Sequence, residues 1–532
     1  MAYNLETYQT PFWAKSGNFV RGRDPLGVQN SSISVYATLL PGLTNLTLRL
    51  RYYGTYLWLL DHYRRLPSNN VFKKDHYGQY TFIRRSELII AFIMGNKYPE
   101  EQSVIGSDFV SKNINEIKEK GYYDIALGAD KHKDTPKGSV YWDYTSGALG
   151  QYYAGSLVAL NLINQSSGYF LVNQDYGKEL AEAYNSSISS DAAKLFLERI
   201  SEGKLYEEDI DKLDDVALNK DYRNSPEGDF YIKMLLSNDG PNSKTSSNDL
   251  TWQRKESLQL FMTLLKETNN DKAWLDLPIT SYKECLTKSK NEISEATFGW
   301  YFYYLNELAH HSLEAVFWGL LVEMDKGNYT LQQFINVITN QVFDLYSEKL
   351  ENVEYPSIIE LMDKLDNQKY ITLNYIRDIS VSVKNHASIS GITEGIFALL
   401  CLYRDNQHKL QEAQDYAVNH FLHTKHGNAL DVFNVYIESC KNMNFKEFVR
   451  RLVHTLLNEH IAIAYNKMGN GEKNLLKFVI EDNYLVHIET MTPNFTNPRL
   501  KTLYNFTRDL HLVNTKDELT PEGEALLIQL NN

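Results

Sequence analysis

Long segments with helical spacing of apolar residues, interrupted by few Pro or Gly, constrain the fold of this chain most strongly. The 532 residues include only 13 Pro and 28 Gly, the residues that most often break helices. Apolar residues recur every three to four positions over 45–65, 85–94, 258–266, 295–324, 331–348, 392–403, 410–423, 430–440 and 446–467. The pattern predicts a mainly α-helical protein with a multi-helix body.

Short β-hairpins and loops are expected between these helices. Apolar runs at 475–480 and 484–488 flank a polar turn and predict a β-hairpin. Residues 106–155 are rich in Gly, Tyr and Lys, which indicates loop with short elements. The polar run 238–248 is expected to be a linker.

The cysteines and the hydropathy pattern bear on the compartment. Cys285, Cys401 and Cys440 are the three cysteines, and they lie far apart without a CxxC pair, which favours a reduced environment. The N-terminus lacks the basic and apolar regions of a signal peptide. No run reaches about 18 uninterrupted apolar residues, so no membrane-spanning helix is expected. We therefore expect a cytoplasmic protein that does not contact a membrane.

Complete catalytic signatures are missing from the sequence. There is no GxxxxGK[ST] loop, no GxGxxG between a strand and a helix, and no GxSxG elbow. Nucleotide hydrolysis by this chain is therefore not expected. We assign no catalytic residue, no metal ligand and no cofactor.

One helix carries a cluster that keeps an enzymatic alternative open. Glu307 and His310 have the i, i+3 spacing of di-iron carboxylate bundles, and His311 and Glu314 follow on the same helix. Such bundles need a second ExxH motif, which the sequence lacks in a comparable helix. The favoured interpretation is a helix whose Glu and His side chains face solvent or a partner. The alternative is a metal-dependent hydrolase or nuclease built around these four residues.

Basic residues concentrate at the N-terminal end of an otherwise acidic chain. Residues 1–100 hold 12 Lys and Arg against 6 Asp and Glu, whereas the whole chain has a net charge of −13. Tyr63, Tyr77 and Tyr80 lie among these cations, a mixture that suits phosphate contact and base stacking. The predicted DNA-binding residues of this region are Arg49, Arg51, Arg64, Arg65, Lys73, Lys74, Arg84 and Arg85. Alternatively, such arginines complement helix dipoles and cover apolar surface with their stems.

The last residues of the chain have the order of a winged-helix module. Asn497 and Pro498 begin a short helix, a polar hairpin tip follows at 514–518, and Leu519-Thr520-Pro521-Glu522-Gly523 caps another helix. This ending resembles the LGLV…LTPEG ending of winged-helix transcription regulators, with His511 in place of a Gly. The resemblance implies a recognition helix whose DNA-facing side carries Arg499, Lys501, Thr502, Asn505 and Arg508. Residues 441–532 have no net charge, which weakens the case for DNA.

A second resemblance covers the N-terminal part. The motifs at 23–27, 39–45 and 49–53, together with the ending, resemble uncharacterised large, mainly helical bacterial proteins encoded in phage-defence gene clusters. This resemblance implies partner proteins encoded nearby, such as an ATPase or a nuclease.

The domain organisation and the function are predicted as follows. We expect four consecutive regions: a basic helical region (1–105), a loop-rich and acidic helical region (106–248), a helical domain (249–440), and a helix, β-hairpin and winged-helix-like module (441–532). The predicted function is a non-catalytic recognition or adaptor subunit of an antiphage-defence-type complex that engages DNA, partner proteins or both. A structural scaffold that dimerises through the winged helix is a further alternative.

Overall fold

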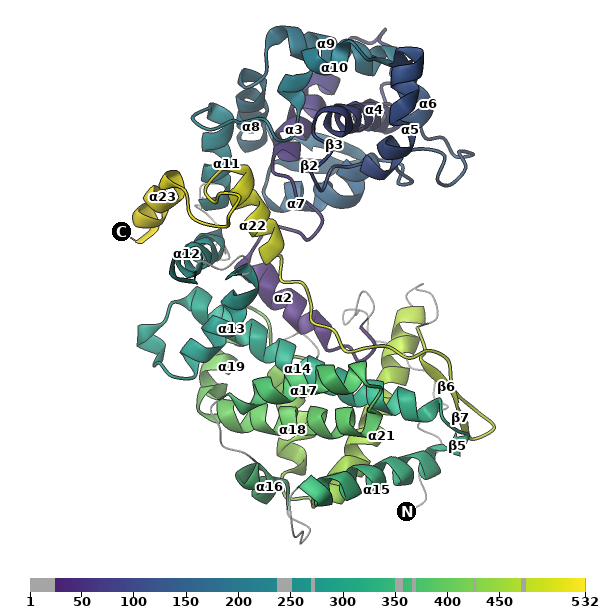
Figure 1. The fold of residues 1–532 in the computed structure, drawn as a ribbon, viewed down its shortest axis with the longest axis vertical. Helices are drawn as coiled ribbons and strands as arrows, with labels where there is room; N and C mark the ends of the chain where they lie inside the picture. Colours follow the sequence, from purple (N-terminus) through teal and green to yellow (C-terminus); the bar gives the residue numbers. More distant parts are fainter. Residues whose placement is uncertain are drawn as a thin grey trace. The chain divides into compact units, whose positions relative to one another are not determined.

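The computed structural model describes residues 24–236, 251–268, 273–349, 357–365, 370–423, 427–469 and 475–531 (Figure 1). The chain is mainly helical with small sheets, which confirms the predicted fold class at that level. It forms two compact units, each assembled from segments that are distant in the sequence. We call residues 39–277 and 497–531 the α3 unit, and residues 24–38 and 278–496 the α14 unit. The predicted linker at 238–248 lies outside the described residues.

Helices account for most of the α3 unit. In order these are α3 (Arg51–Arg65), α4 (His76–Lys97), α5 (Ser107–Lys120), α6 (Ile125–Ala129), the π-helix η1 (Leu149–Tyr153), α7 (Ala154–Ala159), α8 (Tyr176–Ser186), α9 (Ser190–Glu202), α10 (Asp209–Lys212), the 3-10 helix η2 (Asp214–Val216), α11 (Pro226–Leu236), α12 (Thr251–Thr268), α22 (Leu500–Asp509) and α23 (Pro521–Asn531). Its antiparallel strand pairs are β1 (Tyr122–Tyr123) with β4 (Leu205–Tyr206), and β2 (Ile163–Ser166) with β3 (Tyr169–Val172).

Tyrosines form much of the interior of the α3 unit. The rings of Tyr52, Tyr53 and Tyr56 on α3 each lie 5.2–5.4 Å from the ring of Tyr153, centroid to centroid. All four side chains are buried, and such edge-to-face and tilted pairs add to the burial of their large surfaces. The high tyrosine content of the chain is therefore used for the core, and α3 is the helix around which this unit packs.

The α14 unit contains the longest helix of the described chain. Its elements are the 3-10 helix η3 (Lys290–Glu292), α14 (Glu295–Met324), β5 (Tyr329–Thr330), α15 (Leu331–Lys349), α16 (Ile358–Lys364), α17 (Ile371–Lys384), α18 (Ser388–Asn406), η4 (Gln407–Lys409), α19 (Leu410–Asn419), α20 (Ala429–Tyr436), η5 (Glu438–Cys440), α21 (Phe445–Gly469), β6 (Phe478–Glu481) and β7 (Tyr484–His487). The unit boundaries fall within α2 (Gln29–Leu39) and α13 (Ala273–Cys285).

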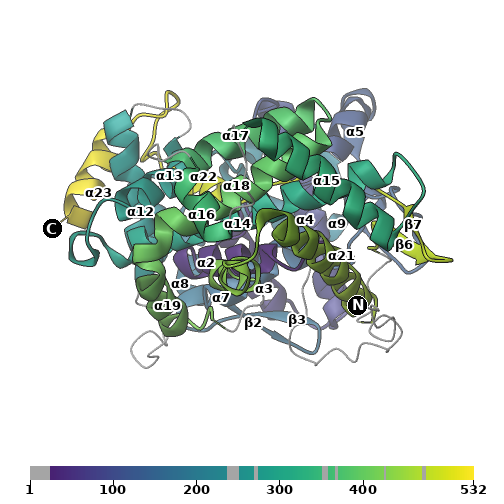
Figure 2. The same ribbon diagram turned by 90° about the horizontal axis from the view of Figure 1, so that it is seen from below.

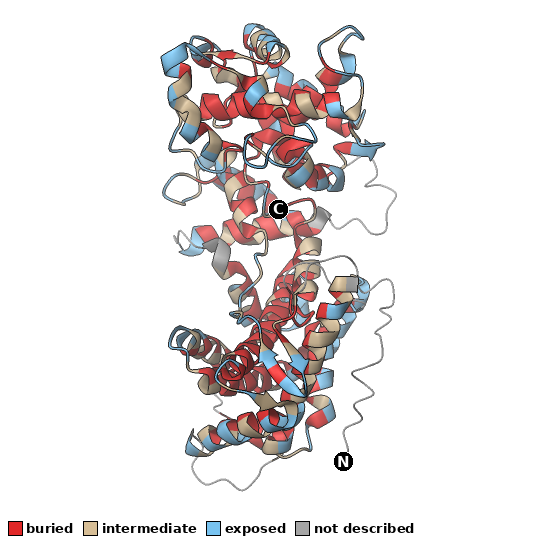
Figure 3. Ribbon diagram, turned by 90° about the vertical axis from the view of Figure 1, so that its right-hand side faces the viewer, coloured by how far each residue is buried: buried red, intermediate tan, exposed pale blue. Residues whose placement is uncertain are grey.

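Helix α14 is buried around nearly its whole circumference, in agreement with the apolar residues on all its faces. In Figure 3 the buried residues are concentrated in the helices. It packs along α18, and α18 packs in turn against α17; Figure 2 shows these three helices from below. The close approach of α14 and α18 depends on Gly395, where an added Cβ would lie 2.7 Å from the carbonyl oxygen of Ser312. The predicted range 295–324 coincides with α14.

The predicted C-terminal β-hairpin is present as β6 and β7. The turn consists of Asp482 and Asn483, both with positive φ (48° and 70°), as the right-handed twist of a two-residue hairpin requires. Strand β5 pairs with the other side of β7, giving the order β5-β7-β6. The hairpin and strand β5, which directly precedes α15, therefore form one small three-stranded sheet.

Two local predictions were less accurate. The range 106–155, expected to be loop with short elements, contains the short α6 and η1 but also the 14-residue helix α5. The expected helix start at Asn497 and Pro498 is also shifted, because Arg499 adopts a left-handed conformation (φ 64°) and α22 begins at Leu500. Between α22 and α23 the only pairing is a single bridge of Val513 with Leu519. Within the described ranges, no helix has both the length and the apolar character needed to span a bilayer.

Candidate functional site

Two of the predicted DNA-binding arginines are buried inside the α3 unit. Arg51 is fully buried and its Nε lies 3.2 Å from Oε1 of Glu227, which is buried as well. Arg84 is also buried, and it donates hydrogen bonds of 2.6–2.8 Å to the carbonyl oxygens of Ala129, Trp142 and Tyr144. Both guanidinium groups have internal partners, so they are not accessible to a phosphate.

Arg49 and Arg85 are also bound within the fold. Arg49 is 7% exposed, and its Nη1 lies 2.5 Å from Oε2 of Glu101. Arg85 forms a two-point ion pair with Asp130 at 2.6 and 2.8 Å. Both guanidinium groups are thus held by carboxylates of the fold, although Nε of Arg49 has no hydrogen-bond partner. Four of the eight predicted N-terminal cations therefore have structural partners.

The other four cations of this group, Arg64, Arg65, Lys73 and Lys74, are exposed. Arg64 and Arg65 end α3 and share the carboxylate of Asp61, whose side chain is only 5% exposed. One carboxylate cannot neutralise two guanidinium groups, so the end of α3 keeps a net positive charge. Phosphate contact is thus geometrically open to these cations.

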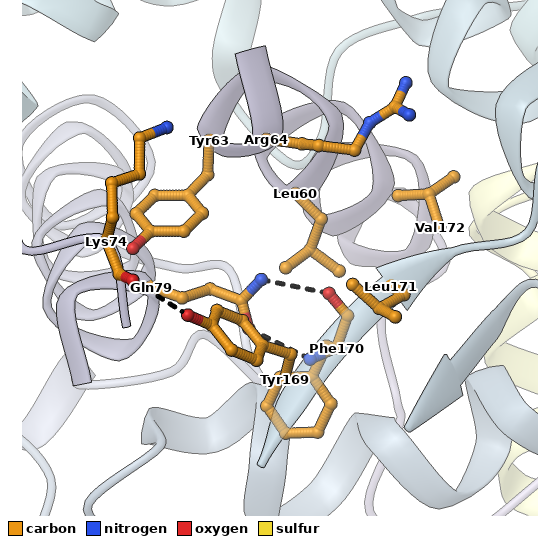
Figure 4. Close-up of a pocket in the computed structure, with 9 residues that line it drawn as sticks. All are labelled: Leu60, Tyr63, Arg64, Lys74, Gln79, Tyr169, Phe170, Leu171 and Val172. Carbon is orange, nitrogen blue, oxygen red and sulfur yellow. Dashed lines mark hydrogen bonds between the residues drawn. The ribbon is translucent and has the colours of Figure 1, made fainter. Parts of the chain in front are cut away.

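A small pocket of about 180 Å³ opens beside two of these cations (Figure 4). Figure 4 shows Lys74 and Arg64 on opposite sides, with Leu60 and Tyr63 between them. The pocket is lined by Leu60, Tyr63, Arg64, Lys74, Gln79, Tyr169, Phe170, Leu171 and Val172. We call this the aromatic pocket. It combines an apolar interior with a basic rim.

Strand β3 forms one wall of the aromatic pocket, and Gln79 of α4 attaches it. The two-residue turn of the β2–β3 hairpin has positive φ at Ser167 (49°) and Gly168 (84°). Alternation in an antiparallel pair then directs the backbone groups of Phe170 away from β2. The buried side-chain amide of Gln79 satisfies both, donating to the carbonyl of Phe170 and accepting from its N–H, each at 2.9 Å (Figure 4).

Tyrosine hydroxyls position the rim lysine. The hydroxyl of Tyr63 donates to the carbonyl oxygens of Lys73 (2.6 Å) and Asp75 (2.9 Å), and that of Tyr169 donates to the carbonyl of Lys74 (3.0 Å). Burial raises the pKa of Tyr63 to about 12, so this hydroxyl remains a donor at neutral pH. The Asp75 side chain accepts from the N–H of Gly78 and caps α4. The turn that carries Lys74 is therefore fixed.

The ammonium group of Lys74 keeps hydrogen-bonding capacity at the rim. Its Nζ donates to the carbonyl of Leu66 at 2.5 Å and lies 5.6 Å from the ring centroid of Tyr63. An ammonium has three N–H donors, and the Tyr63 face attracts the cation without using them. A cavity of about 150 Å³ holds a benzene ring. The aromatic pocket therefore has room for one planar ring whose anionic substituent would meet Lys74 or Arg64.

The Glu and His cluster of α14 is buried, contrary to the expectation that it faces solvent or a partner. Glu307 accepts from the N–H (2.8 Å) and hydroxyl (2.7 Å) of Thr496. Glu314 accepts from the N–H of Asn494 (3.1 Å) and from the side chain of Gln29 (2.5 Å). The two carboxylates thus attach the segment 494–496 to α14.

The histidines of the cluster have different surroundings. His310 lies with Nε2 3.0 Å from the carbonyl of Asn494, and the neighbouring carboxylates Glu307 and Glu314 raise its pKa against the effect of burial. The His311 ring stacks on Phe495 at 4.2 Å, and neither ring nitrogen has a hydrogen-bond partner. Burial lowers the pKa of His311 to about 3, so the ring is neutral. In the described ranges no group of three or more His, Cys, Asp or Glu is arranged to hold a metal ion. The enzymatic alternative receives no support from this geometry.

The predicted recognition helix, α22, is partly packed within the α3 unit. Thr502 is buried and its hydroxyl donates to the carbonyl of Thr44 at 2.6 Å. The side chain of Asn505 is half-buried and donates to the carbonyl of Leu48 at 3.4 Å. Lys501 is half-buried and Arg508 is exposed. On the face predicted to contact DNA, Thr502 and Asn505 therefore make internal contacts, whereas the cations Lys501 and Arg508 remain at least partly exposed. Arg499 lies before the first residue of the helix.

Sequence reasoning did not identify the residues of β3 that line the aromatic pocket. The signal was present, because Ser167-Gly168 separates the polar run at 164–166 from the apolar run at 169–172, a hairpin pattern. The sequence of β2 and β3 does not indicate, however, that β3 packs against α3 and α4, which lie about a hundred residues earlier. Comparisons with protein-family models, curated proteins and solved structures found no match.

Proposed function

We propose that this chain is a non-catalytic recognition subunit that binds DNA by taking one unstacked base into the aromatic pocket. The observation that carries the proposal is the placement of Arg64 and Lys74 on opposite sides of a ring-sized apolar pocket walled by Tyr63 and Tyr169. The resemblance to phage-defence proteins adds the proposed setting, a bacterial complex with an ATPase or nuclease. A winged-helix role for α22 and α23 belongs to the same proposal and rests on the order of those elements.

The chemistry of the pocket favours single-stranded over duplex DNA. A base within a duplex is already stacked, whereas an unpaired base is free to stack on an aromatic side chain, a contact worth about 1–3 kcal/mol. Cations beside such a platform contact the flanking phosphates and make binding salt-dependent. Because the whole chain is acidic, its other surfaces repel DNA, and binding is directed to the basic rim.

The test is a fluorescence-polarisation titration with a labelled single strand and the matching duplex, at several salt concentrations between about 50 and 200 mM. We expect tighter binding of the single strand. In the double variant R64Q/K74Q, the slope of log affinity against log salt should decrease by about 1.4, since each phosphate contact on a single strand contributes about 0.7. Lys112→Gln is the control, because Lys112 is an exposed cation on α5 of the same unit and does not line the pocket.

Two substitutions of Tyr169 separate base stacking from charge. Tyr169→Phe keeps the ring and should retain most of the affinity. Tyr169→Leu removes it and should weaken single-strand binding by about 5- to 160-fold, the equivalent of about 1–3 kcal/mol. Equal affinity for single strand and duplex, together with equal affinity of the two Tyr169 variants, would refute the proposal.

Adaptor function is the second candidate, favoured by apolar side chains on the β6–β7 hairpin. Tyr484, Val486 and Ile488 lie on the same face and are 40–49% exposed. Exposed apolar groups of this kind are typical of protein-binding surfaces. The test is co-expression with the ATPase or nuclease encoded nearby: Val486→Glu should abolish co-purification, whereas His487→Gln on the opposite face should not. Unchanged co-purification of Val486→Glu would exclude the hairpin.

A further inference from the structure

A larger groove of about 840 Å³ lies along α22 within the α3 unit, and it shares no residue with the aromatic pocket. Its lining includes Arg49, Lys220, Tyr222, Arg223, Lys501 and Arg508. Sites for small ligands usually measure about 300–1,000 Å³, so the groove has the volume for a ligand of nucleotide size. We call this the α22 groove.

Two cations of α22 provide its basic side. Lys501 and Arg508 are two helical turns apart and therefore on the same face. They lie beside the ring of Tyr504, at 4.5 and 5.9 Å from its centroid. Burial and the neighbouring Arg508 lower the pKa of Lys501, in agreement with this crowding of like charges. Among the described residues, Arg508 makes no ion pair within 4 Å, so its charge is available.

The other charged groups of the groove have partners. Arg49 pairs with Glu101 (2.5 Å) and with the carboxylate of Asp509 (3.5 Å), which also accepts from a backbone N–H. Lys220 lies 2.9 Å from Asp215, and Arg223 lies 2.5 Å from Asp221. The remaining lining groups that titrate are Glu100 and His511. Arg508 is therefore a lining cation on the α22 side that has no carboxylate within 4 Å among the described residues.

An unsatisfied hydroxyl provides independent evidence for a ligand. Tyr222 is 4% exposed and lines the groove, yet its hydroxyl has no hydrogen-bond partner. The buried side-chain oxygen of Asn219, also in the lining, has none either. Leaving a buried polar group unpaired costs about 1–3 kcal/mol, so such groups usually have a partner or a functional reason. The wall of the groove thus contains a hydroxyl and an amide oxygen without hydrogen-bond partners, in addition to Lys501 and Arg508.

We propose that the α22 groove binds a phosphate monoester of nucleotide size, with Lys501 and Arg508 holding the phosphate oxygens. The hydroxyl of Tyr222 donates a hydrogen bond to the ligand, and the oxygen of Asn219 accepts one from a ligand hydroxyl or amino group. A free nucleotide and the phosphorylated end of a DNA strand present the same chemistry. Both are therefore tested.

The experiment is isothermal titration calorimetry of the full chain with a nucleoside monophosphate and with a 5′-phosphorylated dinucleotide, each compared with its form lacking the phosphate. We expect the phosphorylated form of at least one pair to bind, the unphosphorylated form to bind at least about tenfold more weakly, and inorganic phosphate to compete. Arg508→Gln should weaken binding by about tenfold or more. Lys516→Gln, an exposed lysine at the neighbouring hairpin tip that does not line the groove, should leave it unchanged.

Tyr222→Phe separates a binding role from a structural one. Because the hydroxyl has no internal partner, its removal should leave the thermal unfolding temperature unchanged or higher, while the affinity falls about tenfold. Absence of phosphate-dependent binding for both ligands would overturn the proposal, as would binding that Arg508→Gln and Tyr222→Phe do not weaken. The double variant R64Q/K74Q should bind these ligands normally, so this test and that of the aromatic pocket fail independently.

Discussion

Replacing Glu314 by Gln should change the pH dependence of stability in the α14 unit. Burial raises the pKa of the Glu314 carboxyl to about 7, against the lowering effects of His310 and of its hydrogen-bond donors. In the unfolded chain a Glu carboxyl titrates near about 4.3. Between these two pKa values the folded state keeps a proton on Glu314 that the unfolded state has released. The stability that this group contributes is therefore lost as the pH rises through about 7.

The magnitude follows from the two pKa values. Between about pH 5 and pH 8, ionisation of Glu314 should lower the free energy of unfolding by about 2.5 kcal/mol. Gln resembles the protonated carboxyl and does not titrate, so Glu314→Gln should gain about that amount relative to the natural chain over this interval. His311, whose lowered pKa has the opposite effect on stability, is present in both proteins, so its own contribution cancels in the difference. The pKa of His310, which the Glu314 carboxylate helps to raise, should fall in the variant, so the difference reports the coupled pair of Glu314 and His310.

Differential scanning calorimetry at the two pH values measures this difference. A change of 1 kcal/mol shifts the unfolding temperature of a unit of this size by about 2–4 °C, so the variant should gain about 5–10 °C relative to the natural chain at the higher pH. Glu447→Gln, an exposed glutamate of the same unit, is the control and should show no such gain. A temperature difference between E314Q and the natural chain that is equal at both pH values would refute the reasoning.

Two further predictions concern buried groups of the α3 unit. Arg51→Met should cost about 3–5 kcal/mol because it leaves the buried Glu227 without its partner, and R51M/E227L should recover most of that loss; equal losses in both variants, measured by urea unfolding, would contradict this account. Gly147→Ala should destabilise more than Gly138→Ala, although both have positive φ, because only at Gly147 would the added Cβ lie 2.7 Å from the buried carboxylate of Glu87. A comparison of their urea midpoints tests this, and equal midpoints would show that the contact is relieved without cost.

Local sequence patterns predicted the helices and turns that depend on residues a few positions apart in the chain. Apolar residues recur throughout 295–324, and this range coincides with α14. A helix that is buried on all sides needs apolar residues around its whole circumference, so the pattern extends over the full length of the helix. The hairpin with its turn at Asp482 and Asn483 was predicted from the two apolar runs that flank a polar turn. The segment 106–155 was predicted less well, because its glycines and lysines mask the short helices α5 and α6.

The roles of the charged residues depended on contacts between distant segments. Arg64 and Arg51 belong to the same basic cluster in the sequence, yet Arg64 is exposed at the end of α3 while Arg51 is buried against Glu227, 176 residues away. The same holds for Glu314, which the helical pattern alone left free to face solvent and which instead binds Asn494. Burial of a charge is tolerated only where a partner is present, and the sequence does not show which segment brings that partner.

The sequence by itself determined that the chain is mainly helical, where its longest helix begins and ends, and that cations and tyrosines are mixed near the end of α3. The tertiary structure decided which of those cations remain accessible and placed β3 beside α3 and α4 to form the aromatic pocket. The reason is physical. Helix and turn formation depend on residues a few positions apart, whereas pockets and buried ion pairs depend on which distant surfaces pack together to remove apolar area from water.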